Sequence, residues 1–319
     1  MLRLAFVGLL TLLAATPAAA DYPTRPISIV VAFTPGGPSD VLSRIVGKKL
    51  EQLLGQPFII ENRPGAGGNI AAEAVARATA DGHTLLMGNN SILATNASLY
   101  KKVNYDAEKD FEPISLVGSQ ANILVVHPSV PARSLADLIA LAKASPGKLN
   151  FASSGYGAAA HLAGELFKTE AKVDIVHVAY KGAAPALQDV IAGHVQMMFA
   201  TAASVVGHIK SGAVRALAVT TPRRTAVLPE LPTVAESGIP GFDATTWHGL
   251  VAPAGTPKEV LAALHRATVA ALNDPEVRKA LGDLGVDIIG GTPAEFSAYI
   301  TAEIPKWTAI VKASGAKLE

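Results

Sequence analysis

The stretch ISIVVAFTPGGPSD, residues 27–40, joins a continuous apolar run to a turn rich in glycine and proline. The run at residues 27–33 is apolar at nearly every position, which is typical of a strand that is covered on both faces. Beyond the turn, apolar residues recur at helical spacing up to Leu54, so a helix is predicted there, with Ser39 and Asp40 able to cap it. This order of strand, turn and helix is the first half of a βαβ unit.

The same alternation continues along the chain. Predicted strands follow at residues 58–61, 84–87, 123–126, 150–152, 175–178, 197–200, 214–219 and 250–252, and predicted helices at residues 70–78, 135–144, 159–169, 183–192 and 204–211. Capping boxes predict helix starts at Ser134, Thr256 and Thr292, and Asp274 precedes a proline that predicts another. The pattern therefore predicts an α/β fold with mainly parallel sheets.

The first twenty residues, MLRLAFVGLLTLLAATPAAA, have the form of a signal peptide. Arg3 provides the positive start, residues 4–15 form the apolar middle, and three alanines end the segment before Asp21. The apolar part is shorter than the roughly 20 residues that cross a bilayer, so no membrane anchor is expected. We therefore predict export to the periplasm and removal of residues 1–20.

The composition narrows the possible functions. The chain has 319 residues, 27 Lys+Arg, 26 Asp+Glu and no cysteine. This length suits two domains, and a formal charge of +1, which becomes zero when Arg3 is removed, provides no field for holding a nucleic acid. The absence of cysteine excludes disulfides, thiolate catalysis and cysteine metal sites. The sequence is thus typical of a globular protein that does not bind nucleic acid and that carries no lipid on a cysteine.

Two glycine-rich turns, at residues 35–40 and 153–160, each follow a predicted strand and precede a predicted helix. In open parallel sheets, ligands bind beyond the carboxyl ends of the strands, where helix N-termini offer unpaired N–H groups and a partial positive charge. Glycine there lets a ligand approach the backbone, so such a turn can hold an anion without lysine or arginine. The alternative is that these glycines serve only the geometry of the turns.

A hydrolase site is a second possibility. Ser153 or Ser154 would act as the nucleophile, with His177 and Lys181 as its partners. The sequence has no G-x-S-x-G elbow, however, and serine in a glycine turn is normally a cap or a hydrogen-bond donor.

Three weaker motifs remain open. His161 and Glu165 share a helix face and could hold a metal, but two ligands do not make a site. Residues 155–160 match the form of a dinucleotide fingerprint, against which export argues. Arg63 suits a bidentate contact with a carboxylate and a structural turn equally well.

Several stretches together resemble a known family, the Bug family of extracytoplasmic solute receptors of tripartite tricarboxylate transporters. They run in the family's order from Tyr22 to nearly the end of the chain, and together they are specific. The main ones are YPTRPI at 22–27, GGPSD at 36–40, ENRPGAGG at 61–68, ASSGYG at 152–157, HLAGE at 161–165 and WHGL at 247–250.

The resemblance implies a two-lobed periplasmic binding protein, type II-like, that closes around a small organic carboxylate and delivers it to membrane subunits. The chain is expected to cross between lobes near residues 120–122 and 244–247, so that residues 21–121 and 246–319 form one lobe and residues 122–245 the other. We expect a monomer without cofactor or catalytic activity. The alternatives are an exported hydrolase and a regulatory receptor that reports the same ligand to a sensor protein.

The resemblance also implies a ligand site between the two turns. The first group of candidates comprises Thr34, Gly37, Pro38, Ser39 and Asp40, facing Ser153, Ser154, Gly157 and Ala158; the second comprises Arg63, Gly67, His161, Lys181 and Ala200. Family members often have serine at position 158 and aspartate at positions 196 and 200, where this chain has Ala158, Gln196 and Ala200. The loss of an aspartate favours an anionic or aromatic carboxylate over an amino acid.

Overall fold

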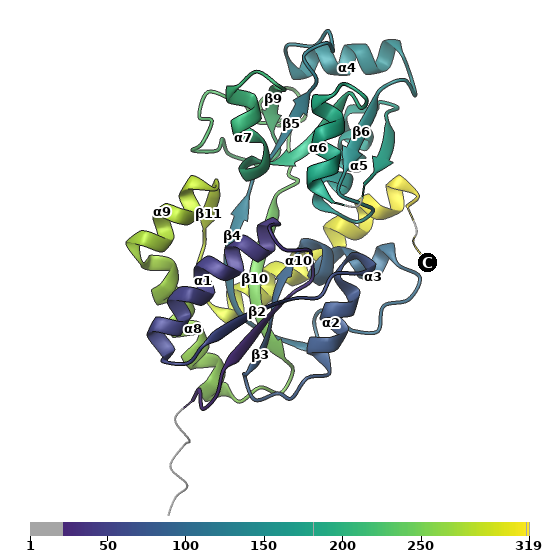
Figure 1. Ribbon diagram of the computed structural model, residues 1–319. Helices are drawn as coiled ribbons and strands as arrows, with labels where there is room; N and C mark the ends of the chain where they lie inside the picture. The colour runs from purple at the N-terminus through teal and green to yellow at the C-terminus, as the bar shows by residue number, and fades with distance from the viewer. Residues whose placement is uncertain (1–21, 181, 317, 319) are drawn as a thin grey trace, which may run out of the picture.

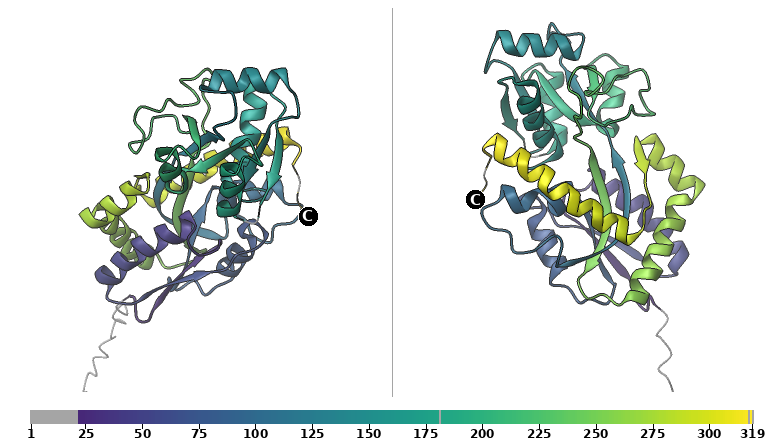
Figure 2. Two further views of the ribbon diagram at one scale, coloured as in Figure 1. Left: turned by 45° about the horizontal axis from the view of Figure 1, so that its top comes forward. Right: turned by 180° about the vertical axis from the view of Figure 1, so that it is seen from behind.

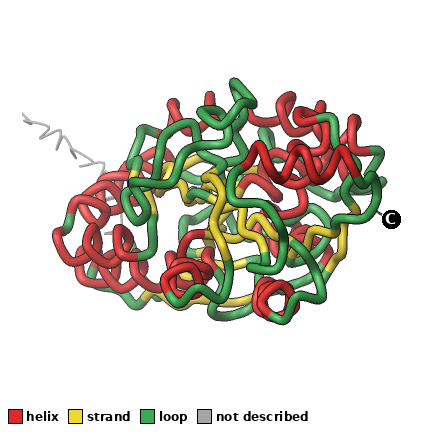
Figure 3. Tube along the Cα trace, turned by 90° about the horizontal axis from the view of Figure 1, so that it is seen from above, coloured by secondary structure: helices red, strands yellow, loops and turns green. Residues whose placement is uncertain are grey.

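Two β-sheets, each flanked by helices, form the frame of the protein (Figure 1). The computed structural model describes residues 22–180, 182–316 and 318. The predicted signal peptide and Lys181 therefore lie outside the described residues. Within the described residues, no helix is both long and apolar enough to span a membrane. Seen from above, the strands lie in the middle of the molecule and helices lie toward its outside (Figure 3).

The first lobe is built on a six-stranded sheet with the order β11-β4-β10-β3-β1-β2. Its strands are β1 (Ile27–Val31), β2 (Phe58–Asn62), β3 (Thr84–Asn89), β4 (Phe111–Gln120), β10 (Thr246–Pro253) and β11 (Val286–Ile288). Its helices are α1 (Pro38–Leu54), η1 (Ala66–Gly68), α2 (Asn69–Ala76), η2 (Ser91–Thr95), α3 (Asn96–Leu99), α8 (Lys258–Asn273), α9 (Pro275–Asp283) and α10 (Pro293–Ser314). Alternate side chains of β1 enter different cores: Ile29 and Val31 pack with α1, α8 and α9, whereas Val30 packs with α2. This covering of both faces explains the continuous apolar run.

The second lobe is built on a five-stranded sheet with the order β7-β6-β8-β5-β9. Its strands are β5 (Asn122–Val126), β6 (Asn150–Ser153), β7 (Val176–Ala179), β8 (Met197–Thr201) and β9 (Arg215–Val219). Its helices are α4 (Leu135–Ala144), α5 (Ala159–Ala171), α6 (Ala183–Ile191) and α7 (Ala202–Lys210). The side chains of Phe151, Phe167 and Phe199 lie in the core of this lobe, joined to the core of the first.

Both sheets are mixed, which refines the prediction of mainly parallel sheets. The strands β2, β1 and β3 run parallel, as do β7, β6 and β8, but β10 and β5 are antiparallel to both of their neighbours. The reason is the path of the chain: β4 passes through Ala121 directly into β5, and the chain returns through residues 220–245 into β10. A strand that enters a lobe at the boundary between the lobes is antiparallel to the strands that end at that boundary. The α/β fold class itself is confirmed.

Most of the predicted helix ends are confirmed. Ser134 and Thr292 each form a complete capping box, and Asp274 accepts two backbone N–H groups at the start of α9. Gly55 ends α1 in the left-handed conformation that glycine adopts readily.

Two predicted caps are wrong. The N-cap of α1 is Gly37, and Ser39 and Asp40 already lie within the helix, where their side chains contact other elements. The N-cap of α8 is Pro257, while the Thr256 hydroxyl donates to the Pro253 carbonyl at the end of β10. In α1, Pro38 occupies the first helical position, which its fixed φ suits, so the helix begins before Ser39. In α8, Pro257 itself is the N-cap, and the helix begins at Lys258.

The helix α10 belongs to the first lobe but also contacts α5 of the second. In the right-hand view of Figure 2, which is seen from behind, it runs diagonally across the near side of the molecule. Buried in this region, Glu303 accepts hydrogen bonds from the indoles of Trp247 on β10 and Trp307 on α10, at 2.9 and 2.8 Å. Lys306 bridges Glu303 and Asp243 at 3.0 and 2.9 Å. These contacts fix α10 to the strand by which the chain returns from the second lobe.

Candidate ligand-binding site

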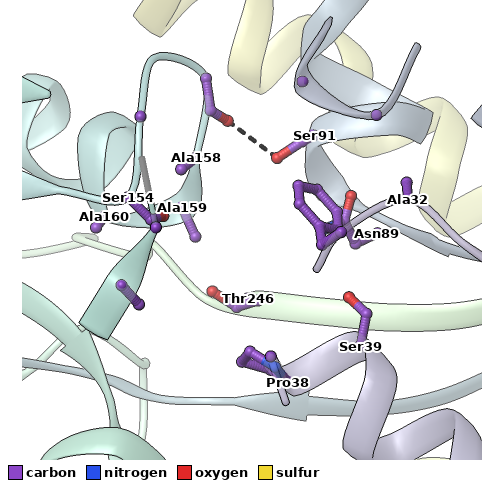
Figure 4. A pocket seen from close by; sticks show the side chains of 18 of the residues that line it. Ala32, Pro38, Ser39, Asn89, Ser91, Ser154, Ala158, Ala159, Ala160 and Thr246 are labelled. Atoms are coloured by element: carbon purple, nitrogen blue, oxygen red, sulfur yellow. Dashed lines mark hydrogen bonds between the residues drawn. The ribbon is translucent and has the colours of Figure 1, made fainter. Parts of the chain in front are cut away.

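A cavity of about 720 Å³ lies between the two lobes, where β1, β3, β6 and β8 end (Figure 4). Residues of both glycine-rich turns line it, together with residues of the two strands that connect the lobes. Several helices begin at this cavity, among them α1, α5 and α6, which have Gly37, Ala158 and Gly182 as their N-caps. None of these three N-termini has a side-chain cap. Their N–H groups and dipoles therefore favour an anion in the cavity without requiring a basic side chain.

In the first lobe, Thr34, Gly37, Pro38 and Ser39 line the cavity, as the sequence placed them, but Asp40 does not. The sequence could not foresee the direction of the Asp40 side chain, since that depends on strand β2.

The buried carboxylate of Asp40 lies behind the turn and accepts hydrogen bonds from the Gly36 N–H at 2.9 Å and from Asn62 Nδ2 at 3.0 Å. Burial acts to raise the pKa of Asp40, but the hydrogen bonds from Arg44, Gly36 and Asn62 outweigh it and lower that pKa below its usual value. Asp40 thus holds the turn in place as an anion.

In the second lobe, Ser154, Gly157 and Ala158 line the cavity, but Ser153 does not. Ser153 is fully buried, and its hydroxyl contacts His177 Nε2 at 2.6 Å and the Gly155 N–H at 3.1 Å. Its neighbours show that Ser153 shapes the turn from behind, as Asp40 does in the first lobe.

The second turn contacts the first lobe through Gly157. Its carbonyl accepts a hydrogen bond of 2.9 Å from the Ser91 hydroxyl of the first lobe, drawn as a dashed line in Figure 4. Its φ of 75° lies in the left-handed region, and a Cβ atom there would stand 2.5 Å from a methyl group of Leu99. Only glycine therefore allows this approach of the two lobes.

The second group of candidates is dispersed. Gly67 lines the cavity, whereas Arg63 is half exposed and pairs with Glu61 at 2.7 Å. Ala200 is fully buried in β8, and His161 is buried behind the second turn, where its Nδ1 accepts from the Gly157 N–H at 3.1 Å. Lys181 lies outside the described residues.

The two departures at positions 196 and 200 do not bear on the ligand directly. The Gln196 side chain accepts a hydrogen bond of 3.0 Å from the Asn150 N–H, away from the cavity, and Ala200 is part of the core. The argument from these two positions against an amino acid therefore loses its structural basis.

Several lining residues escaped the sequence analysis. Three polar ones, Asn122, Thr246 and His248, come from the two connecting strands and form the floor, and Asn89, Ser91 and Thr201 also line the cavity. Asn122 Nδ2 donates to the Thr246 hydroxyl oxygen at 3.0 Å. The apolar ones are Phe33, Tyr100, Met198 and Phe199. The WHGL stretch contained a signal, because a histidine in an otherwise apolar strand needs a polar partner, but nothing in the sequence placed it at the cavity.

Behind the second turn, the buried His161 and the partly buried His177 form a pair whose ring centroids are 4.2 Å apart, with Tyr156 edge-on to both. Burial, followed by repulsion from His177 and Lys168, lowers the pKa of His161 to about 3. Burial and then Lys168 lower the pKa of His177 to about 4. Both imidazoles are therefore neutral near pH 7.

The contact between Ser153 and His177 has the geometry of a nucleophile and a base, but the Ser153 hydroxyl does not reach the cavity. Ser154 lines the cavity and, among the described residues, its hydroxyl makes no hydrogen bond to a histidine. The hydrolase alternative thus lacks an activated nucleophile that a substrate in this cavity could reach.

The neutral histidine pair predicts acid sensitivity. In the unfolded chain these groups bind protons near pH 6.5, whereas in the folded protein their pKa values are about 3 and about 4. The free energy of unfolding is therefore expected to have its full value above about pH 6.5. It should fall by a few kcal/mol as the pH drops toward 4. Chemical denaturation at several pH values measures this. The double variant His161→Gln, His177→Gln should show a shallower slope, and His194→Gln, at an exposed site, should not.

Comparisons with known proteins find relatives that match nearly the whole chain. The family model described as the tripartite tricarboxylate transporter family receptor matches residues 42–316. Protein BugT of Bordetella pertussis is 39% identical over 307 residues, which cover 96% of this chain and 94% of BugT. The structure of R. palustris Rpa4515 with adipate is 39% identical, with a TM-score of 0.87 over 93% of this chain and all of that one. MatC from Rhodopseudomonas palustris, with bound malate, is 34% identical, with a TM-score of 0.83 over 91% of this chain and all of that one.

Proposed function

Because the chain belongs to the tripartite tricarboxylate transporter receptor family, we propose that it binds a small organic carboxylate in the cavity between its lobes. The observation that carries this proposal is the convergence of α1, α5 and α6, all without side-chain caps, on one cavity. Three helix N-termini stabilise one carboxylate by hydrogen bonds and dipoles. Relatives that were solved with adipate and malate support a carboxylate as the ligand.

We further propose that Thr34, Gly37, Pro38 and Ser39 contact the carboxylate from one side, and Ser154, Gly157 and Ala158 from the other. All seven line the cavity. Asp40, Ser153 and His161 then act from behind, by holding the two turns in the conformation that presents their N–H groups. The walls from Phe33, Tyr100, Met198 and Phe199 favour a ligand whose remaining part is apolar, because a second buried charge there would lack a partner.

The proposed lobes comprise residues 21–121 with 246–319, and residues 122–245. Both crossings, at Ala121 and before Thr246, lie beside the cavity floor. A small change in the backbone dihedral angles at these crossings would therefore open and close the cavity. In this proposal the protein is exported by its signal peptide, acts in the periplasm as a monomer and passes its ligand to the membrane subunits of a tripartite transporter. It needs no cofactor and catalyses no reaction.

A thermal-shift panel tests the proposed function. The mature protein, residues 21–319, is heated with benzoate, adipate, malate and citrate, and with the uncharged amide of each as a matched control. A carboxylate at about 100 times its Kd stabilises the folded state by roughly 2.7 kcal/mol, so a rise of several degrees in Tm is expected for at least one of them. The amides should have little effect. A panel without any shift, or amides that act as strongly as the acids, would contradict the proposal.

A further inference from the structure

The floor of the cavity holds a buried histidine that the proposed function has not yet used. His248 lies on β10 with only 1% of its surface exposed, and its Nε2 atom stands 3.0 Å from the Ser39 hydroxyl oxygen. Its other ring nitrogen, Nδ1, is buried and has no hydrogen-bond partner among the described residues. Burial lowers the pKa of His248 to about 4, so the ring is neutral near pH 7 and carries one proton on one of the two nitrogens.

The surroundings of the two nitrogens decide where that proton lies. If Nδ1 carried the proton, a buried N–H group would have no acceptor, which is rare and costly in proteins. If Nε2 carries it, the proton forms a hydrogen bond to Ser39, and Nδ1 is left as an unpaired acceptor, a less costly arrangement. The contacts therefore favour the tautomer in which the imidazole donates and the Ser39 oxygen accepts.

This direction of the hydrogen bond determines what the serine can do. Among the described residues, the Ser39 hydroxyl oxygen forms its hydrogen bond with His248, and Ser39 lines the cavity. Figure 4 shows its oxygen pointing into that space. Because His248 occupies a lone pair of the oxygen, the hydroxyl proton is left for an acceptor in the cavity.

We propose that His248 is a positioning residue which, by donating to Ser39, directs the Ser39 hydroxyl proton toward the ligand carboxylate. This inference rests on the proposed function for the nature of the ligand. It converts a hydroxyl that could either donate or accept into a dedicated donor, and so favours a carboxylate over a neutral amide or an ammonium group at this point.

The tautomer can be measured without any ligand. Long-range ¹H–¹⁵N NMR of the mature protein, with its histidine side chains labelled, distinguishes protonated from unprotonated ring nitrogens, and the His248 signals are assigned by their loss in His248→Gln. We expect a protonated Nε2 that shifts in Ser39→Ala. A protonated Nδ1 would overturn the inference, whatever binds in the cavity.

A double-mutant cycle tests the role in binding, with adipate, malate and benzoate as probes in calorimetric titrations. Ser39→Ala and His248→Leu should each weaken binding about tenfold, and the double variant should be no weaker than Ser39→Ala, because His248 acts through the serine. His248→Gln, whose amide N–H can donate to Ser39, should recover most of the affinity. Unchanged affinity in His248→Leu, or losses that multiply in the double variant, would overturn the inference alone. If none of the three probes binds the unmodified protein, the proposed function is contradicted. The tautomer measurement still tests the hydrogen bond between His248 and Ser39.

Discussion

Replacing Gly37 by valine is expected to weaken carboxylate binding by about 100-fold or more while it leaves the free energy of unfolding nearly unchanged. Gly37 has φ −76° and ψ 167°, an extended conformation that valine adopts without strain. A Cβ atom at this position would meet only the Thr34 carbonyl oxygen, at 3.4 Å. Because Gly37 is the N-cap of α1 at the cavity wall, the added methyl groups would shield the N–H groups that the ligand needs.

Titration calorimetry and chemical denaturation separate the two effects. The matched control is Gly207→Val, because Gly207 also has open space around its Cβ position but lies on α7 and does not line the cavity. This control should retain full affinity. If Gly37→Val instead loses stability together with affinity, the turn has a structural role, and if it retains affinity, the ligand does not approach this backbone.

The variant Glu303→Ala is expected to have the largest effect on stability, a loss of about 3–5 kcal/mol. The change would leave the buried indole N–H groups of Trp247 and Trp307 without their acceptor and would remove one of the two carboxylates that face Lys306. A buried donor left without an acceptor costs more free energy than its hydrogen bond contributed. The loss of one carboxylate partner of Lys306 adds to this cost. Chemical denaturation provides the measurement.

Two further variants make this test specific. Glu303→Gln retains an acceptor oxygen and should lose clearly less stability than the alanine variant. Glu170→Ala removes an exposed glutamate from α5 and should change stability by no more than about 0.5 kcal/mol. Equal losses in the alanine and glutamine variants would show that the charge, and not the acceptor for the two indoles, stabilises this region.

Most of the fold could be predicted because its signals are local. The continuous apolar run before the first turn, the capping boxes at Ser134 and Thr292, and Gly55 at the end of α1 each act within a few residues, so the sequence shows them directly. The mixed character of the sheets could not be predicted in the same way. It follows from where β5 and β10 enter their lobes, which depends on the path of the whole chain.

The features of the candidate site likewise fall into those that the local sequence shows and those that depend on distant segments. The sequence alone determined that two glycine-rich turns end strands and begin helices, because strand, turn and helix are consecutive, and both turns do line one cavity. Only the tertiary structure decided that Asp40 and Ser153 turn away from this cavity, that α6 adds a further helix N-terminus, and that His248 meets Ser39 from a position 209 residues away along the chain. The direction of a side chain and its distant partners depend on packing between segments, and no local pattern of residues encodes that packing.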